Sequence, residues 1–76
     1  MKVTKEQFQY MKEGIITDMV EFLIKDMNVS LTEALNILYN SDLFAKLDNP
    51  ETGLYYQGSR YVYTFLQHEL QNGVIG

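Results

Sequence analysis

The stretch NVSLTEALNILYNS, residues 28–41, contains one complete short helix with a boundary at each end. Ser30 followed by Glu33 forms a capping box, in which each side chain accepts a hydrogen bond from a backbone N–H at the start of a helix. Val29 and Ala34 are spaced as the hydrophobic staple that accompanies such a start. Four residues at helical spacing are expected on the inner face of this helix: Leu31, Ala34, Leu35 and Leu38. The stretch therefore predicts a helix that ends near its last two residues.

The residues before this stretch predict one long helix. Thr4 and Gln7 form a second capping box. Apolar residues then recur every three or four positions: Phe8, Met11, Ile15, Met19, Phe22 and Leu23, with Ile16, Val20 and Met27 widening the stripe. Charged residues are expected on the other side: Lys12, Glu13, Asp18, Glu21 and Lys25. Gly14 disfavours a helix interior by about 1 kcal/mol, so it indicates a bend or the close approach of another helix.

A third helix, short, is expected directly after the opening stretch. Ser41 can cap it, and Leu43, Phe44 and Leu47 lie at helical spacing behind that cap. Residues 48–53 are then rich in turn formers, and Gly53 can adopt a left-handed conformation. The helical pattern therefore stops at these residues.

Residues 54–57 contain strand-like side chains but have no second strand to pair with, so they are assigned to the loop. Gly58-Ser59 restarts the helical pattern, with Ser59 as the predicted cap. The last helix carries apolar residues at helical spacing: Val62, Phe65, Leu66 and Leu70. Asn72-Gly73 is expected to end it, because glycine is the usual residue after a helix C-terminus.

These patterns together predict an all-α fold in a single domain over residues 1–76. We expect a compact bundle of about four helices: one long N-terminal helix, two short central helices and one C-terminal helix, with a turn-rich loop before the last. With 76 residues, 46% of them hydrophobic and none cysteine, the chain can hold one core without disulfides. The composition excludes disulfide-stapled modules, cysteine-ligated zinc domains and membrane-spanning proteins.

The charge balance bears on partners and location. Six Lys plus Arg against ten Asp plus Glu give a net charge of -4, which disfavours nucleic acid as a ligand. The first seven residues carry charges where a signal peptide needs an apolar run. We therefore expect a cytoplasmic protein without a membrane segment.

The sequence offers no constellation for catalysis. His68 is the one histidine, and beside Glu69 near a helix C-terminus it is expected to be structural. One imidazole cannot supply a zinc site. Residues 48–59 fail as a calcium loop, because Pro50 offers no side-chain oxygen at position three and Ser59 replaces the bidentate glutamate at position twelve. We therefore expect no enzyme, no cofactor and no metal, with no catalytic residues to assign.

A helix-turn-helix is the alternative interpretation of residues 31–47, since two helices meet there at a short corner. The charges argue against this interpretation. A recognition helix over residues 42–48 would present two carboxylates, Asp42 and Asp48, with Lys46 as its cation. Because the geometry fits but the charges do not, a small DNA-binding transcriptional regulator is the second hypothesis and not the first.

Aromatic residues gather near the start of the last helix: Tyr55, Tyr56, Tyr61 and Tyr63, together with Arg60. Tyrosine and arginine are enriched in interface hot spots, although some of these side chains can equally cover the small core. Because Tyr61 is expected to point inward with Phe65, the candidate partner-binding residues are Tyr56, Arg60 and Tyr63.

Several segments resemble a family of short uncharacterised bacterial helical proteins, a domain of unknown function common in gut bacteria. The resemblance is carried by caps, a turn and the core stripe: residues 26–30, Glu33-Ala34, Leu38-Tyr39 with Ser41, residues 52–55, and residues 59–70. It implies an accessory role beside neighbouring gene products, some of which resemble ADP-ribosyltransferase toxins. It brings no catalytic residues with it.

The leading expectation is a non-catalytic protein–protein interaction or accessory module, antitoxin-like in the sense of that resemblance. Its partner would be another protein, such as the product of a neighbouring gene, and a homodimer is the other assembly considered. An acidic domain of this kind suits a basic partner, because opposite charges steer association.

Overall fold

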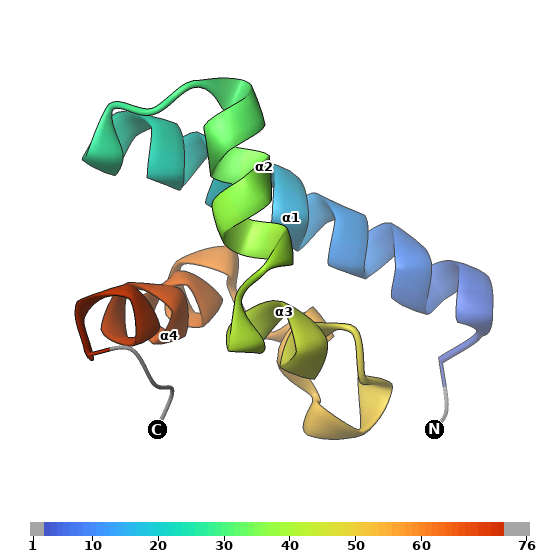
Figure 1. The fold of residues 1–76 in the computed structure, drawn as a ribbon. Helices are drawn as coiled ribbons and strands as arrows, with labels where there is room; N and C mark the ends of the chain where they lie inside the picture. The colour runs from blue at the N-terminus through green and yellow to red at the C-terminus, as the bar shows by residue number, and fades with distance from the viewer. Residues whose placement is uncertain (1–2, 73–76) are drawn as a thin grey trace.

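The computed structural model describes residues 3–72, which fold entirely into helices and turns (Figure 1). The α-helices are α1 (Lys5–Met27), α2 (Leu31–Tyr39), α3 (Asp42–Leu47) and α4 (Ser59–Asn72). Two single-turn 3-10 helices, η1 (Pro50–Thr52) and η2 (Leu54–Tyr56), connect α3 to α4. The predicted all-α fold with one long and three shorter helices is confirmed, and residues 3–72 contain no strand. Gly73, the predicted helix stop, lies outside the described residues.

The helix starts follow the predicted caps. The hydroxyl of Thr4 accepts a hydrogen bond from the Gln7 N–H at 3.1 Å, and both halves of the capping box are formed. Ser30 and Glu33 form the same reciprocal pair at the start of α2. Ser41 accepts from the Phe44 N–H and caps α3. These three predictions are confirmed because capping is a local interaction within one turn.

The start of α4 differs from the prediction. The carbonyl oxygen of Gly58 accepts from the Val62 N–H at 3.0 Å, so Gly58 and not Ser59 precedes the first helical turn. The hydroxyl of Ser59 instead donates to the Asp18 carboxylate on α1 at 2.6 Å. Ser59 therefore joins two helices, because a long-range acceptor is available to its hydroxyl.

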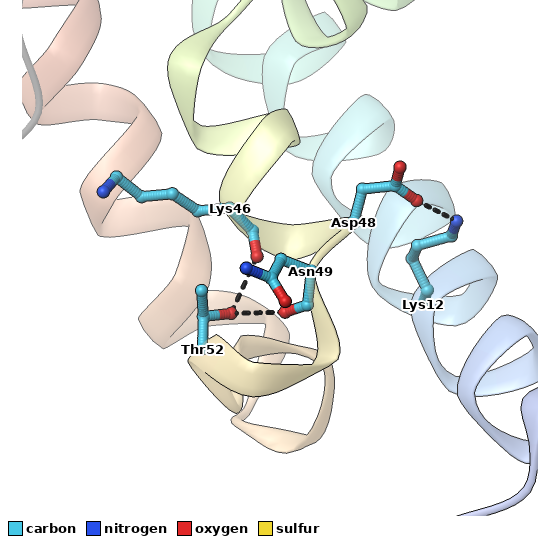
Figure 2. Close-up of polar contacts among 5 residues, drawn as sticks. All are labelled: Lys12, Lys46, Asp48, Asn49 and Thr52. Atoms are coloured by element: carbon cyan, nitrogen blue, oxygen red, sulfur yellow. Dashed lines mark hydrogen bonds and ion pairs between the residues drawn. The ribbon is translucent and has the colours of Figure 1, made fainter.

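The turn-rich segment before α4 is ordered by its own polar groups (Figure 2). The Thr52 hydroxyl lies 2.7 Å from the carbonyl oxygen of Lys46 and 2.9 Å from that of Asn49, and donates toward both. Gly53 adopts the expected left-handed conformation, with φ 72°. Residues 54–56 form the 3-10 turn η2, which directs Tyr55 onto the ring of Phe8 at 5.0 Å between centroids.

The core draws side chains from every α-helix and from η2. Its members are Phe8, Ile15, Met19, Val20 and Leu23 of α1, Ala34 and Leu38 of α2, Leu43 and Leu47 of α3, Tyr55 of η2, and Val62, Tyr63 and Leu66 of α4. In Figure 1, α1 runs along the molecule and α2 crosses it. The long helix therefore supports α2, α4 and η2, and α3 packs against α2, α4 and η2.

The burial of some residues on the predicted apolar and charged faces differs from the prediction. Leu31, Met27 and Leu70, expected in the core, are 59%, 46% and 42% exposed. Lys12, expected on the solvent side, is buried, because it is paired with Asp48 across the fold (Figure 2). Within residues 3–72 no other element approaches Gly14 closely, since a Cβ built on this glycine would meet none of their atoms within 4 Å.

Candidate functional site

The three candidate partner-binding residues occupy three different environments. Tyr56 is 63% exposed on η2, with its ring stacked on Tyr55 at 4.9 Å. The Arg60 guanidinium lies 4.1 Å from the centre of the Phe22 ring, in a cation–π contact between α4 and α1. Tyr63 is only 1% exposed. The structure therefore leaves Tyr56 and Arg60 exposed, with Arg60 also in a contact within the fold, and it buries Tyr63.

The prediction for Tyr63 is wrong, because its side chain belongs to the core. Its hydroxyl donates to the Asp26 carboxylate at 2.9 Å, and its ring lies 5.0 Å from that of Phe22. Burial raises the pKa of Tyr63 from 10.0 to about 12, and the hydrogen bond to Asp26 and its negative charge act in the same direction. The Arg60 charge lowers the pKa slightly against these effects. Tyr63 is therefore a buried hydrogen-bond donor that keeps its proton.

The prediction for Tyr61 is wrong in the opposite sense. Tyr61, expected to point inward with Phe65, is 54% exposed. The two rings do lie one turn apart in an edge contact, with centroids 5.1 Å apart. The sequence could not distinguish Tyr61 from Tyr63, because two tyrosines separated by one residue project from different sides of a helix.

An open apolar groove lies between α1 and α2. Its volume is ≈ 580 Å³. The wall from α1 consists of Ile16, Val20 and Ile24, and the wall from α2 consists of Leu31, Leu35 and Tyr39. Exposed apolar surface of this kind marks sites of association in soluble proteins. We take this set of six side chains, called the α1–α2 groove below, as the candidate functional site.

Each wall is a row of side chains four residues apart, which places them on one face of their helix. α1 uses a different face for α4, through Asp18, Phe22 and Asp26. Tyr39 is held at one end of the groove by an edge contact with the Phe44 ring at 4.8 Å. The groove is therefore built on two helices that the core holds in place.

The rim of the groove is acidic. Glu13, Thr17 and Glu21 follow the α1 wall, and the lining residues include no lysine, arginine or histidine. Glu13 also lines two shallower hollows on α1 beside Tyr10, which is 80% exposed. Among residues 3–72 the one ion pair joins Lys12 to Asp48, so neither rim glutamate is neutralised by a described cation.

α1 and α2 contain more apolar residues than their core contacts require, and this surplus in the sequence indicates the groove. α1 has the row Ile16, Val20 and Ile24 beside its core stripe, and α2 has a second apolar row beside Ala34 and Leu38. One neighbouring helix cannot cover both rows. The sequence predicts Ile16, Val20, Leu31 and Leu35 in the core and gives no place to Ile24 and Tyr39, so the groove was not predicted.

The helix-turn-helix interpretation meets a specific obstacle at α3. The Glu69 carboxylate of α4 accepts hydrogen bonds from the backbone N–H groups of Asp42 and Leu43, at 2.8 and 3.0 Å. A recognition helix contacts base edges through its N-terminal residues. Here that end of a six-residue helix is occupied by a carboxylate from within the chain.

The other residues considered for chemistry lie on α4 and in the turn-rich segment. His68 lies exposed on α4. In the turn-rich segment, Asp48 pairs with Lys12, and the Asn49 side chain accepts from the Glu51 N–H. No group of three or more His, Cys, Asp and Glu side chains within residues 3–72 is placed to hold a metal ion.

The comparisons with known proteins identify no relative. No protein family, no curated protein and no solved structure matches this chain. Across residues 3–72, no helix has both the length and the apolar character required to cross a membrane.

Proposed function

We propose that this chain is a non-catalytic protein-binding module that docks its partner in the α1–α2 groove. The observation that carries the proposal is the exposure of Leu31 and Tyr39, at 59% and 50%, above the half-buried Ile16, Ile24 and Leu35. Burying one leucine side chain of this kind contributes about 1.5–3 kcal/mol. A partner that covers the groove would gain this contribution at several side chains.

The biological setting we propose is accessory: a cytoplasmic module that binds, and in an antitoxin-like way neutralises, the product of a neighbouring gene. The segments that resemble the gut-bacterial family support this setting. The chain has no cysteine, so its fold requires no oxidising compartment. The position of Glu69 at the α3 N-terminus favours protein over DNA as the ligand.

The test compares two substitutions at equally exposed apolar positions. Leu31→Asp places a charge in the groove, and Tyr61→Asp places the same charge on α4, away from it. Both positions are in the first turn of a helix, where an acidic residue is tolerated. Tagged wild-type and variant chains would be crosslinked in their own host, captured and quantified by mass spectrometry.

We expect wild type and Tyr61→Asp to retain one stoichiometric protein that Leu31→Asp loses. A partner that Leu31→Asp retains and Tyr61→Asp loses would place the docking surface on α4 and overturn the proposal. Recovery of the wild-type chain without a stoichiometric partner would overturn it as well. Circular dichroism of both variants checks that the helices are intact.

A further inference from the structure

The chemistry of the groove also indicates what kind of segment it binds. We infer that its occupant is an amphipathic helix of a partner protein, with an apolar face and cationic residues along the edge that meets Glu13 and Glu21. This inference deepens the proposed function and depends on it. Three arguments support this inference: the length of the groove walls, the charge of the rim, and the repulsion between rims that a dimer would create.

The dimensions match a short helix. The α1 wall extends eight residue steps from Ile16 to Ile24, and the α2 wall eight steps from Leu31 to Tyr39. At a rise of 1.5 Å per residue each wall is about 12 Å long, or roughly two helical turns. A helix that lies in a groove contacts such walls through side chains three and four residues apart. The described residues present no sheet edge to which a strand could add.

The negative charges on the groove rim indicate that one side of the occupant is cationic. Glu13 and Glu21 are two turns apart along the outer edge of the α1 wall, and both are exposed. Lys25, the next charged residue on α1, is outside the lining. Lysine or arginine side chains two turns apart on the occupant would meet both carboxylates. An acidic occupant would be repelled, and the chain's net charge of -4 acts in the same direction during encounter.

A second copy of the chain is the less favourable occupant. A two-fold symmetric dimer places the same surface on both sides of its interface. Such a dimer through the groove would place the acidic rims of both protomers in one interface, and where the two α1 walls face each other Glu13 and Glu21 would meet the partner's pair. Like charges facing each other across an interface oppose association, whereas a cationic helix neutralises them.

The experiment uses two designed helical peptides of roughly three turns with the same leucine face. One carries lysine along its flank and the other glutamate. Each is titrated into isotope-labelled full chain at low salt, and binding is followed by NMR shifts of the Ile16, Ile24 and Leu35 signals. The variant Glu13→Gln/Glu21→Gln removes the rim charge, and Asp42→Asn/Glu51→Gln removes the same net charge elsewhere.

We expect the lysine peptide to shift the groove signals and the glutamate peptide to bind at least tenfold more weakly. The rim variant should lose about fivefold in affinity for the lysine peptide, since two exposed charge pairs contribute on the order of 1 kcal/mol together. The control variant should lose less than twofold. Added salt should weaken binding to wild type more than binding to the rim variant.

Equal binding of both peptides would overturn the inference about charge. Shifts confined to the Tyr56 or Tyr61 signals, or no shift with either peptide, would overturn it as well. A concentration-dependent dimer that Leu31→Asp dissociates would identify a second copy as the occupant. The proposed function is judged separately, because crosslinked capture that depends on Leu31 tests docking in the groove without any assumption about charge.

Discussion

The hydroxyl of Tyr63 donates a 2.9 Å hydrogen bond to the Asp26 carboxylate, which joins the middle of α4 to the last turn of α1. The ring of Phe22 packs against Tyr63 and also makes a cation–π contact with the Arg60 guanidinium. These contacts hold α4 on one face of α1, and the α1–α2 groove lies on another. The stability of this junction can therefore be tested apart from binding.

The first prediction concerns alkaline pH. The pKa of Tyr63 is raised in the folded state to about 12 from 10.0, so the folded chain holds this proton more tightly than the unfolded chain. Its contribution is fully present below pH 10 and is lost as the pH rises toward about 12. Two pKa units correspond to at most about 3 kcal/mol.

Chemical denaturation of wild type and Tyr63→Phe across that pH range measures the effect. Phenylalanine keeps the ring and removes the ionisable hydroxyl, so the variant should lose about 0.5–1.5 kcal/mol at neutral pH. Above pH 10 its stability should fall less steeply than that of wild type. Parallel pH dependence in the two proteins would show that another group controls the alkaline transition.

The second prediction compares two tyrosines on α4 that are two residues apart. Tyr63→Ala should lower the free energy of unfolding by about 3–5 kcal/mol, because it removes a fully buried ring. Tyr61→Ala should lower it by about 1 kcal/mol or less, since the side chain is half exposed. Urea denaturation of both variants checks this difference, and equal losses would contradict the burial described for α4.

The third prediction concerns the Glu69 carboxylate at the start of α3. Glu69→Ala leaves the N–H groups of Asp42 and Leu43 without their acceptor and should cost about 1–2 kcal/mol. Gln67→Ala, at an exposed position on the same helix, is the control and should change stability by less than about 0.5 kcal/mol. Faster hydrogen exchange at Asp42 and Leu43 in the first variant alone would locate the effect.

The fourth prediction concerns the pair formed by Lys12 and Asp48. The Lys12 side chain is 10% exposed and that of Asp48 is 54% exposed, so only the lysine depends on its partner for charge compensation. Asp48→Asn should therefore cost more, about 1–3 kcal/mol, than Lys12→Met, which keeps the buried aliphatic stem. Thermal unfolding of both variants measures this order, and the reverse order would contradict the asymmetric burial.

The fifth prediction concerns Gly14 in the interior of α1. A Cβ at this position would meet no atom within 4 Å, so Gly14→Ala should raise the free energy of unfolding by about 0.5–1 kcal/mol. Thermal unfolding of the variant provides the measurement. Destabilisation would indicate that the glycine serves a contact outside the described fold.

Interactions within one helical turn were predictable from the sequence. The capping boxes at Thr4 and Ser30, the Ser41 cap and the left-handed Gly53 all formed as expected. The position of Lys12 on the core face of α1 was also indicated by the sequence, because it lies four residues after the core residue Phe8 and three before Ile15. No sequence pattern indicated that Lys12 pairs with Asp48, which is 36 residues away.

The sequence by itself determined the four helices, most of their ends and the excess of apolar and acidic side chains. Only the tertiary structure decided that Tyr63 is buried while Tyr61 is exposed, that Glu69 accepts from the first two N–H groups of α3, and that Leu31 lines a groove. Helix starts depend on residues three or four apart, which the sequence shows directly. The choice between core and groove depends on which face of α1 each neighbouring helix covers, and that is set by packing between residues far apart in the chain.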